Sequence, residues 1–214
     1  QSQPSNADIF IIAVPTPFKK DSNKLPTPDI SYILDAVKSI IPFLKESNLV
    51  ILESTSPVGT TEIIAEMIFN ESKLDRYNLK IAYCPERVLP GNILNEIKKN
   101  DRVIGGINQK SSKAAKDFYS KFCVGKFNIT DAKTAELVKL TENSFRDVNI
   151  AFANELSIIS SNLGINYKEL IKIANCHPRV NILTPSPGVG GHCIAVDPWF
   201  IVSRLPKDSK LIKT

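Results

Sequence analysis

The sequence lacks the features that would place it in a membrane or in a disulfide-bonded scaffold. No segment approaches the roughly 18 consecutive apolar residues of a membrane-spanning helix, and the first residues lack the charged and apolar regions of a signal peptide. The 4 cysteines lie far apart and form no Cys-x-x-Cys pair, so neither a disulfide framework nor a zinc ribbon is indicated. We therefore expect a cytoplasmic protein with no membrane association and no metal site.

Blocks of basic residues are also missing. The chain has 27 Lys and Arg residues against 22 Asp and Glu residues, a net charge of +5, and its basic residues are scattered. Binding of a polyanion requires positive charge gathered on one face. The composition therefore disfavours nucleic acid as a partner and suits a small anionic ligand.

The glycine turn that opens a dinucleotide-binding fold is absent. Such folds begin with a strand, a Gly-x-Gly-x-x-Gly turn and a helix. The dense glycine cluster of this sequence, Gly188 to Gly191, instead follows predicted helices. We therefore expect the chain to be a piece of a longer protein whose first strand and glycine turn precede residue 1.

Short apolar runs nevertheless alternate with helical patterns over the first 129 residues. The alternation predicts an α/β domain with an incomplete doubly wound, Rossmann-like parallel sheet. We assign residues 1–129 to this domain. The expected strands are 8–14, 49–52, 79–83, 102–104 and 126–129, and the expected helices are 28–44, one that ends near residue 69, and 111–122.

A different pattern begins at Thr130. Residues 131–163 contain neither Pro nor Gly, and their apolar residues recur with helical period. The predicted helix is about three times as long as the usual 11 or 12 residues, which is typical of a spine or dimer element. Residues 130–214 are therefore predicted to form an α-helical central dimerisation domain, with a second helix at 167–175 and a loop-rich segment at 177–198.

The sequence around Cys193, PGVGGHCIAVDPW, is the strongest local signal for chemistry. Glycines before a thiol let the backbone approach a ligand and leave N–H groups that can hold an oxyanion, while His192 favours the thiolate. An isolated cysteine is otherwise most often a buried structural residue. The glycine density and the nearby Asp197 favour a nucleophile.

Three weaker signals leave alternatives open. Lys139, Asn143 and Arg146 are spaced to share one face of the long helix, but an ordinary solvated face has the same pattern. At the end of a predicted strand, Glu86 could order a water and Arg87 could bind an anion, although such pairs are common on surfaces. Cys176 and His177 have no partner pair at ligand spacing, which disfavours zinc.

Together, these segments resemble the UDP-glucose/GDP-mannose dehydrogenase family. The similar segments cover nearly the whole chain in family order: 10–17, 53–59, 84–91, 139–155 and 177–200. The forms CPERVLPG, HPRVN and GVGGHCIAVDPWF are similar to the branch that oxidises UDP-N-acetylmannosamine. Residues 1–129 would then be the C-terminal part of the NAD-binding domain. Because the family's glycine turn and its UDP-gripping C-terminal domain have no counterpart here, we expect this chain alone to be inactive.

The resemblance implies an NAD-dependent, four-electron oxidation of the C6 alcohol of a UDP-N-acetylhexosamine, for the synthesis of bacterial-type surface polysaccharide. Cys193 would form a thiohemiacetal and then a thioester, and Lys139 would be the acid/base that holds oxyanions with Asn143. Water would be held or activated by Asp197, Glu86 and Thr55.

The resemblance also implies binding residues and a partner. Thr16 and Thr55 match positions that contact NAD. The segment with Arg179 commonly reaches into the other subunit's site in this family, so a homodimer through the long helix is implied. The implied substrate contacts are Arg87, Val88, Lys139, Asn143, Arg146, His177, Arg179 and Gly190.

Other functions remain open. The same chemistry on UDP-N-acetylglucosamine, UDP-glucose or a GDP-sugar uses the same residues, because the C6 chemistry hardly depends on the rest of the sugar. A non-catalytic dimerisation module is compatible with the long helix. A cysteine hydrolase using Cys193 and His192 is disfavoured, because adjacent side chains diverge and rarely form a nucleophile and base pair.

Overall fold

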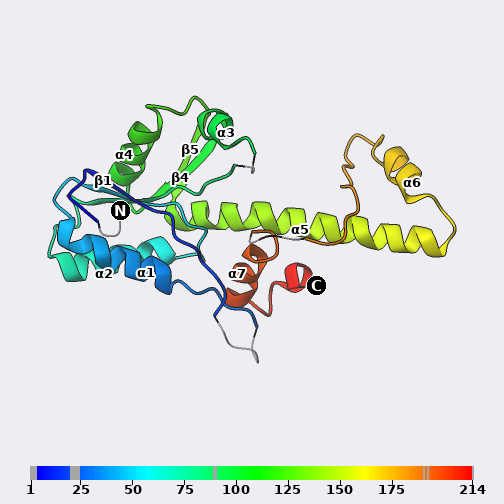
Figure 1. Ribbon diagram of the computed structural model, residues 1–214, viewed down its shortest axis with the longest axis horizontal. Coiled ribbons are helices and arrows are strands. Elements are labelled where there is room, and N and C mark those ends of the chain that lie inside the picture. Colours follow the sequence, from blue (N-terminus) through cyan, green and yellow to red (C-terminus); the bar gives the residue numbers. More distant parts are fainter. Residues whose placement is uncertain (1–3, 20–24, 89–90, 190, 192, 214) are drawn as a thin grey trace. The chain divides into compact units, whose positions relative to one another are not determined.

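The computed structural model describes residues 4–19, 25–88, 91–189, 191 and 193–213 (Figure 1). The chain divides into two compact units, Gln1–Lys139 and Leu140–Thr214. The boundary between the units falls inside one long helix. A domain division at residues 129 and 130 stays a prediction.

The first unit is built on a five-stranded sheet with the order β1-β2-β3-β4-β5. The strands are β1 (Ile9–Ile12), β2 (Leu49–Leu52), β3 (Lys80–Tyr83), β4 (Arg102–Gly106) and β5 (Phe127–Asp131). Strands β1, β2 and β3 are parallel, β4 and β5 are parallel, and β3 and β4 are antiparallel. The predicted α/β, Rossmann-like class is confirmed.

The antiparallel pair was not predicted from the sequence. Only the last residues of the two strands pair, Ala82 with Gly106 and Tyr83 with Gly105. A parallel neighbour would require a crossover connection that brings the chain back to the amino ends of the strands. The connection through α3 (Ile93–Lys99) instead enters β4 from the carboxyl end of β3. As a consequence, β5 ends, and the helix after it begins, near the carboxyl ends of β1, β2 and β3.

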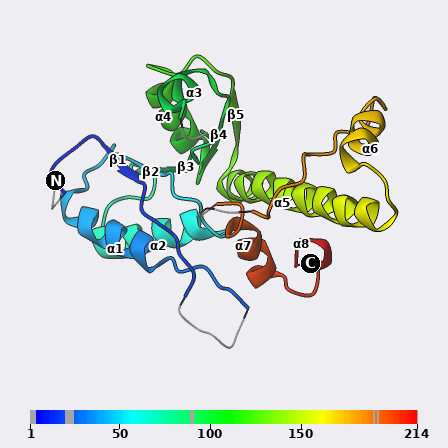
Figure 2. The same ribbon diagram turned by 45° about the vertical axis from the view of Figure 1, so that its right-hand side comes forward.

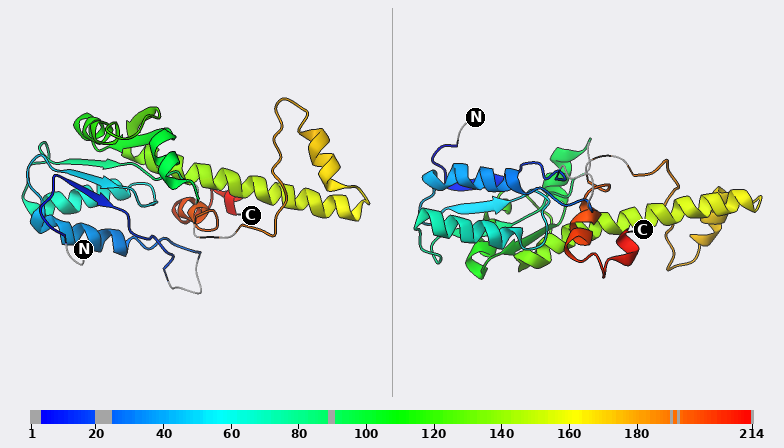
Figure 3. Two further views of the ribbon diagram at one scale, coloured as in Figure 1. Left: turned by 45° about the horizontal axis from the view of Figure 1, so that its top comes forward. Right: turned by 90° about the horizontal axis from the view of Figure 1, so that it is seen from below.

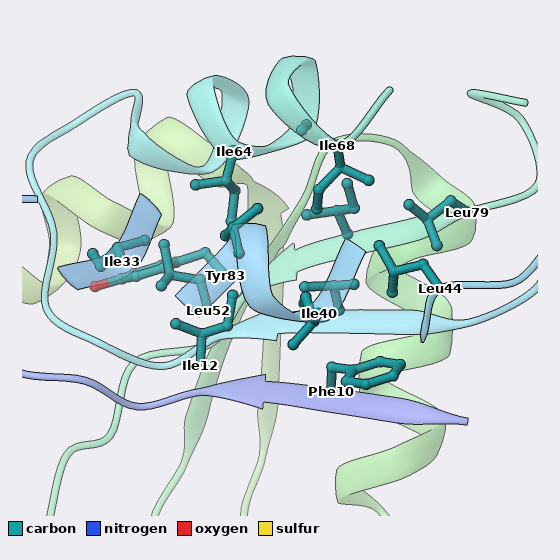
Figure 4. Close-up of a cluster of buried hydrophobic side chains, with 14 of the residues drawn as sticks. Phe10, Ile12, Ile33, Ile40, Leu44, Leu52, Ile64, Ile68, Leu79 and Tyr83 are labelled. Atoms are coloured by element: carbon teal, nitrogen blue, oxygen red, sulfur yellow. The ribbon is translucent and has the colours of Figure 1, made fainter. Parts of the chain in front are cut away.

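Helices cover both faces of this sheet (Figure 2). On one face lie α1 (Ser31–Ile40), the short 3₁₀ helix η1 (Ile41–Phe43) and α2 (Thr60–Ser72), and on the other lies α4 (Gln109–Tyr119). Alternate residues of β2 point to opposite faces, as the pleat requires: Val50 and Leu52 join the first cluster, and Leu49 and Ile51 join the second. Figure 4 shows the first cluster, in which Ile64 and Ile68 of α2 pack over the strands.

The long helix predicted at 131–163 is present as α5 (Ala132–Asn162), 31 residues long (Figure 3). Its first turns belong to the first unit. A Cβ atom at Gly105 of β4 would lie 2.7 Å from the Cβ of Ala135, so glycine at this position lets α5 pack closely against the sheet.

The second unit contains the rest of α5 and three shorter helices, α6 (Tyr167–Ala174), α7 (Asp197–Arg204) and α8 (Lys210–Lys213). The side chain of Asn166 accepts a hydrogen bond from the backbone N–H of Lys168 and so caps α6. Among the described residues, no helix combines the length and the apolar character that crossing a bilayer requires.

Candidate functional site

The loops that follow β1 and β2 are tied together at the carboxyl edge of the parallel strands. The hydroxyl of Thr16 donates to the carbonyl oxygen of Thr55 at 2.8 Å, and the hydroxyl of Ser54 donates to the carbonyl oxygen of Val14 at 2.7 Å. The structure therefore brings together the two predicted cofactor residues, Thr16 and Thr55. This edge is where α/β sheets bind ligands.

The start of α5 is fastened to the loop after β2 by Glu136, a residue that sequence reasoning missed. Its carboxylate accepts from the backbone N–H of Gly59 at 2.5 Å, from the backbone N–H of Thr61 at 2.7 Å and from the Thr61 hydroxyl at 2.6 Å. Burial raises the pKa of the Glu136 carboxyl, against the opposing effect of these hydrogen bonds. Glu136 follows Gly59 by 77 positions and Thr61 by 75 positions, so no local sequence pattern indicates the interaction.

One turn further along α5, Lys139 contacts the loop after β3. The Lys139 Nζ atom donates to the backbone carbonyl oxygen of Glu86 at 2.8 Å. The structure thus brings together two predicted catalytic residues, although the partner of the ammonium group is the main chain and not the carboxylate of Glu86. Arg87 and Val88 follow in the same loop and are half-buried.

The carboxylate of Glu86 faces a buried arginine that the sequence analysis did not single out. Arg102 is 5% exposed, and its Nη2 atom lies 3.3 Å from Oε2 of Glu86. The other guanidinium nitrogens donate to the sulfurs of Cys123 and Cys84, and the group lies 4.3 Å from the ring centroid of Tyr119. Arg102 therefore connects the core to the loop that carries Glu86.

A half-buried acid and two buried thiols lie near Arg102. The Tyr119 hydroxyl donates to Oε1 of Glu53 at 2.5 Å, and burial raises the pKa of both groups. Burial also raises the pKa of the Cys84 thiol to about 11. This shift favours the thiol of Cys84 over the thiolate, which is the nucleophilic form.

In the second unit, Asn143 of α5 pairs with Asp197, the first residue of α7. The Asn143 Nδ2 atom donates to Oδ2 of Asp197 at 2.6 Å, and both side chains are buried. Asp197 and the following Pro198 are residue types favoured in the first turn of a helix. A solvated polar face, which the sequence left open for Asn143, is wrong for this residue.

Cys193 lies on an exposed turn that leads into α7. Its carbonyl oxygen accepts hydrogen bonds from the backbone N–H groups of Val196 at 3.0 Å and of Asp197 at 2.8 Å. Gly191 before it has a φ of +83°, a conformation that favours glycine. Gly190 and His192 lie outside the described residues. The turn holds Cys193 one helical turn before the buried carboxylate of Asp197.

His177 and Arg179 lie on an exposed loop after α6. The Asn175 side chain closes this loop, because its Nδ2 atom donates to the Ile182 carbonyl and its Oδ1 atom accepts from the Ile182 N–H. Within the second unit, α6 lies at the end of α5 that is remote from α7 (Figure 1). Within this unit, the loop with His177 therefore begins at the far end of α5 from α7, and Arg146 is exposed on α5.

Both parts of the chain match one protein family. Residues 1–123 match the model described as UDP-glucose/GDP-mannose dehydrogenase family, NAD binding domain, and residues 133–213 match the central domain of the same family.

Individual relatives are similar over the whole chain. The chain is 57% identical over 219 residues to the UDP-N-acetyl-D-mannosamine dehydrogenase of Campylobacter jejuni, covering 99% of this chain and 53% of the relative. It is 53% identical over 221 residues to the NDP-N-acetyl-D-galactosaminuronic acid dehydrogenase of Ralstonia nicotianae, covering 100% and 51%. A solved structure of UDP-D-ManNAc dehydrogenase from Pyrococcus horikoshii is similar with a TM-score of 0.90 and 43% identity, over 97% of this chain and 49% of that one. The chain spans about half the length of the curated relatives it matches.

Proposed function

Because the chain belongs to the UDP-glucose/GDP-mannose dehydrogenase family, we propose that the full protein oxidises the C6 alcohol of a UDP-N-acetylhexosamine to the uronate with NAD. UDP-N-acetylmannosamine is the favoured substrate, and the product would serve surface polysaccharide synthesis. The observation that carries this proposal is the 57% identity to the UDP-N-acetyl-D-mannosamine dehydrogenase of Campylobacter jejuni. A cytoplasmic location belongs to the same proposal.

The proposed reaction converts the alcohol, two NAD⁺ and one water into the carboxylate, two NADH and three protons. NAD, when bound, accepts one hydride from C6 in each of the two oxidations. After the first oxidation, the Cys193 thiolate adds to the aldehyde carbon and the carbonyl oxygen takes up a proton, which gives a thiohemiacetal. Loss of the hydroxyl proton and of the second hydride then gives a thioester. Water then attacks the thioester, the C–S bond breaks, and the thiolate is regenerated.

The loops after β1 and β2 fit an NAD site. We propose that Thr16 and Thr55 contact NAD, because their 2.8 Å hydrogen bond fixes both loops at the edge where α/β sheets bind dinucleotides. The carboxylate of Glu136 already occupies the N-terminus of α2. A pyrophosphate would therefore bind at another helix N-terminus of the full protein.

Lys139 is the proposed acid/base for the alcohol. Its contact with the carbonyl oxygen of Glu86 supports this role, because it holds the ammonium group beside a second polar residue of the site. The carboxylate of Glu86, which Arg102 orients, is proposed to order the hydrolytic water together with Thr55. General acid–base catalysis of this kind contributes roughly 10²- to 10⁴-fold in rate.

Asn143 and Asp197 are proposed to hold the oxyanion and the water that hydrolyses the thioester. Their 2.6 Å hydrogen bond and their burial support these roles, because a carboxylate in a fixed orientation can align water for attack. Cys193 precedes Asp197 by one turn, and its exposure supports access by a substrate.

The proposed substrate contacts combine cations, amides and backbone groups. Arginine suits the diphosphate of a nucleotide sugar because its guanidinium binds phosphate oxygens in pairs. The loop with His177 and Arg179 lies beyond α6, which supports a role for it in the site of a second protomer. The contacts are Arg87, Val88, Lys139, Asn143, Arg146, His177, Arg179 and Gly190.

The proposed homodimer rests on an apolar stripe of α5 in the second unit. Phe145, Phe152 and Ile159 are 67%, 51% and 44% exposed, and their spacing of seven residues places them on one helix face. Large apolar side chains aligned in this way are typical of a surface that another helix covers.

We expect Phe152→Glu to convert the full-length protein from dimer to monomer, because it places a charge in the middle of that stripe. Sedimentation velocity measures the change. The matched control is Ile63→Glu on α2 of the first unit, which is similarly exposed (44%) and should leave the dimer intact. A monomeric wild type, or a dimeric Phe152→Glu protein, would exclude this interface.

Turnover of the full-length protein with a panel of nucleotide sugars tests the proposed function. We expect NADH formation to be most efficient with UDP-N-acetylmannosamine. For UDP-glucose, which lacks the N-acetyl group, kcat/KM should be lower by roughly 10⁴-fold, since a site that hydrogen-bonds that group leaves its own buried polar groups unpaired with substrates without it. Equal kcat/KM values for the two sugars would contradict the proposed specificity.

A second candidate substrate is favoured by one comparison. The 53% identity to an NDP-N-acetyl-D-galactosaminuronic acid dehydrogenase supports a galactosamine-type sugar for the same chemistry. Fastest turnover with that sugar would select this candidate. If no nucleotide sugar gave NADH, the alternative of a non-catalytic dimerisation module would be selected instead.

A further inference from the structure

Helix α2 begins without a cap of its own. Its N-cap residue is Gly59, which has a φ of +93° and no side chain to accept from the free N–H groups of the first turn. Those groups carry the positive end of the helix dipole and require an acceptor when buried. The acceptor is the carboxylate of Glu136, which comes from α5 and is 0% exposed.

A carboxylate is a costly choice for this position. The hydrogen-bond donors of Glu136 are two backbone N–H groups and one hydroxyl, none of which carries a formal charge. A buried charge is expensive, and apolar residues hold two helices together at less cost. Only a carboxylate, however, presents acceptor oxygens to all three donors at once. This suggests that the geometry at α2 matters for more than the stability of the unit.

Glu136 lies between two loops that carry proposed site residues. The loop it holds, between β2 and α2, contains Thr55, and the hydroxyl of Thr16 is bonded to the Thr55 carbonyl. Three residues after Glu136, Lys139 donates to the carbonyl of Glu86 in the loop after β3. The first turns of α5 thus fix the cofactor loop and the proposed acid/base relative to each other.

We propose that Glu136 is a positioning residue that holds the Thr55 loop in register with Lys139, so that NAD and the acid/base meet the substrate carbon together. The inference rests on the proposed dehydrogenase function. The hydrogen bonds that the Glu136 carboxylate accepts come from Gly59 and Thr61, which have no proposed part in the chemistry. Its effect on the reaction passes through Thr55 and Lys139.

The test uses the full-length protein with Glu136→Gln, which keeps the size of the side chain and turns an amide N–H₂ toward one of the N–H donors. We expect kcat to fall at least tenfold and the Kd for NAD, from isothermal titration, to rise about tenfold. The Kd for the nucleotide sugar should change less than threefold. Measurements are made well below the melting temperature of the variant, so that a smaller folded fraction cannot explain the loss.

The chain offers a matched control on the same two helices. Glu62 of α2 pairs with Lys133 of α5 at 2.8 Å, but both side chains are more than half exposed. Glu62→Gln should leave kcat and the Kd for NAD within twofold of wild type. If Glu136→Gln does not fold, Thr61→Val removes one of the three donors and should lower kcat about threefold.

The outcomes separate the inference from the proposed function. A folded Glu136→Gln protein with wild-type kcat and NAD affinity would overturn the inference, as would an equal loss in Glu62→Gln. If Thr61→Val has to be used, unchanged kcat in that variant would overturn it. A wild-type protein that forms no NADH with any nucleotide sugar would instead overturn the proposed function.

Discussion

Cys193→Ala is expected to abolish net acid formation by the full-length protein while leaving nucleotide-sugar binding almost unchanged. Without the thiol, neither the thiohemiacetal nor the thioester forms, and the loss should be on the order of 10³-fold or more, as for other covalent nucleophiles. Binding should survive because the turn at Cys193 is held through its backbone carbonyl and the side chain is exposed. Product analysis and isothermal titration measure the two effects.

Cys176→Ala is the matched control for this prediction. Cys176 is also exposed and lies in the same unit, but it has no proposed role in the reaction. Its replacement should leave acid formation intact. Acid formation by Cys193→Ala at the wild-type rate would remove Cys193 from the mechanism.

Arg102→Met should cause a large loss of stability. Methionine retains apolar volume but loses the donors to Glu86, Cys84 and Cys123 and the contact with the Tyr119 ring. Because Arg102 is buried, these interactions together contribute about 3 kcal/mol. The melting temperature of the full-length protein should fall by several degrees.

Arg76→Met controls for the loss of an arginine with similar partners. Arg76 also pairs with a glutamate, Glu66, and lies over an aromatic ring, Phe69, but the paired side chains are 55% exposed. Exposed pairs contribute little because water screens them, so the melting temperature should hardly change. Equal shifts for the two variants would show that the burial of Arg102 is not what stabilises the unit.

The repeating elements of the fold were predictable from the sequence. The strand expected at 49–52 is β2, and the absence of Pro and Gly over 131–163 correctly indicated α5. Both signals are local, since an apolar run or a helical period lies within one segment. The short helix α3 and the antiparallel direction of β4 were not predicted, because the direction of a strand depends on where its connection returns.

The site was predictable only in part, for a related reason. The motifs and the family resemblance singled out Lys139, Glu86, Asn143 and Asp197, and the structure joins them in two pairs. Nothing local distinguishes Glu136 from an ordinary helix-surface glutamate. Its contacts, like those of Arg102 with Glu86 and Cys123, join residues far apart in the sequence and appear only when the chain is folded.

The most direct test of the proposed function is the number of NADH molecules formed per nucleotide sugar by the full-length wild-type protein. UDP-N-acetylmannosamine is limiting, NAD is in excess, and the carbon product is identified by mass spectrometry. A four-electron oxidation through a thioester at Cys193 predicts two NADH per sugar, the uronate as the product and no released aldehyde. One NADH per sugar with accumulation of the aldehyde would contradict it.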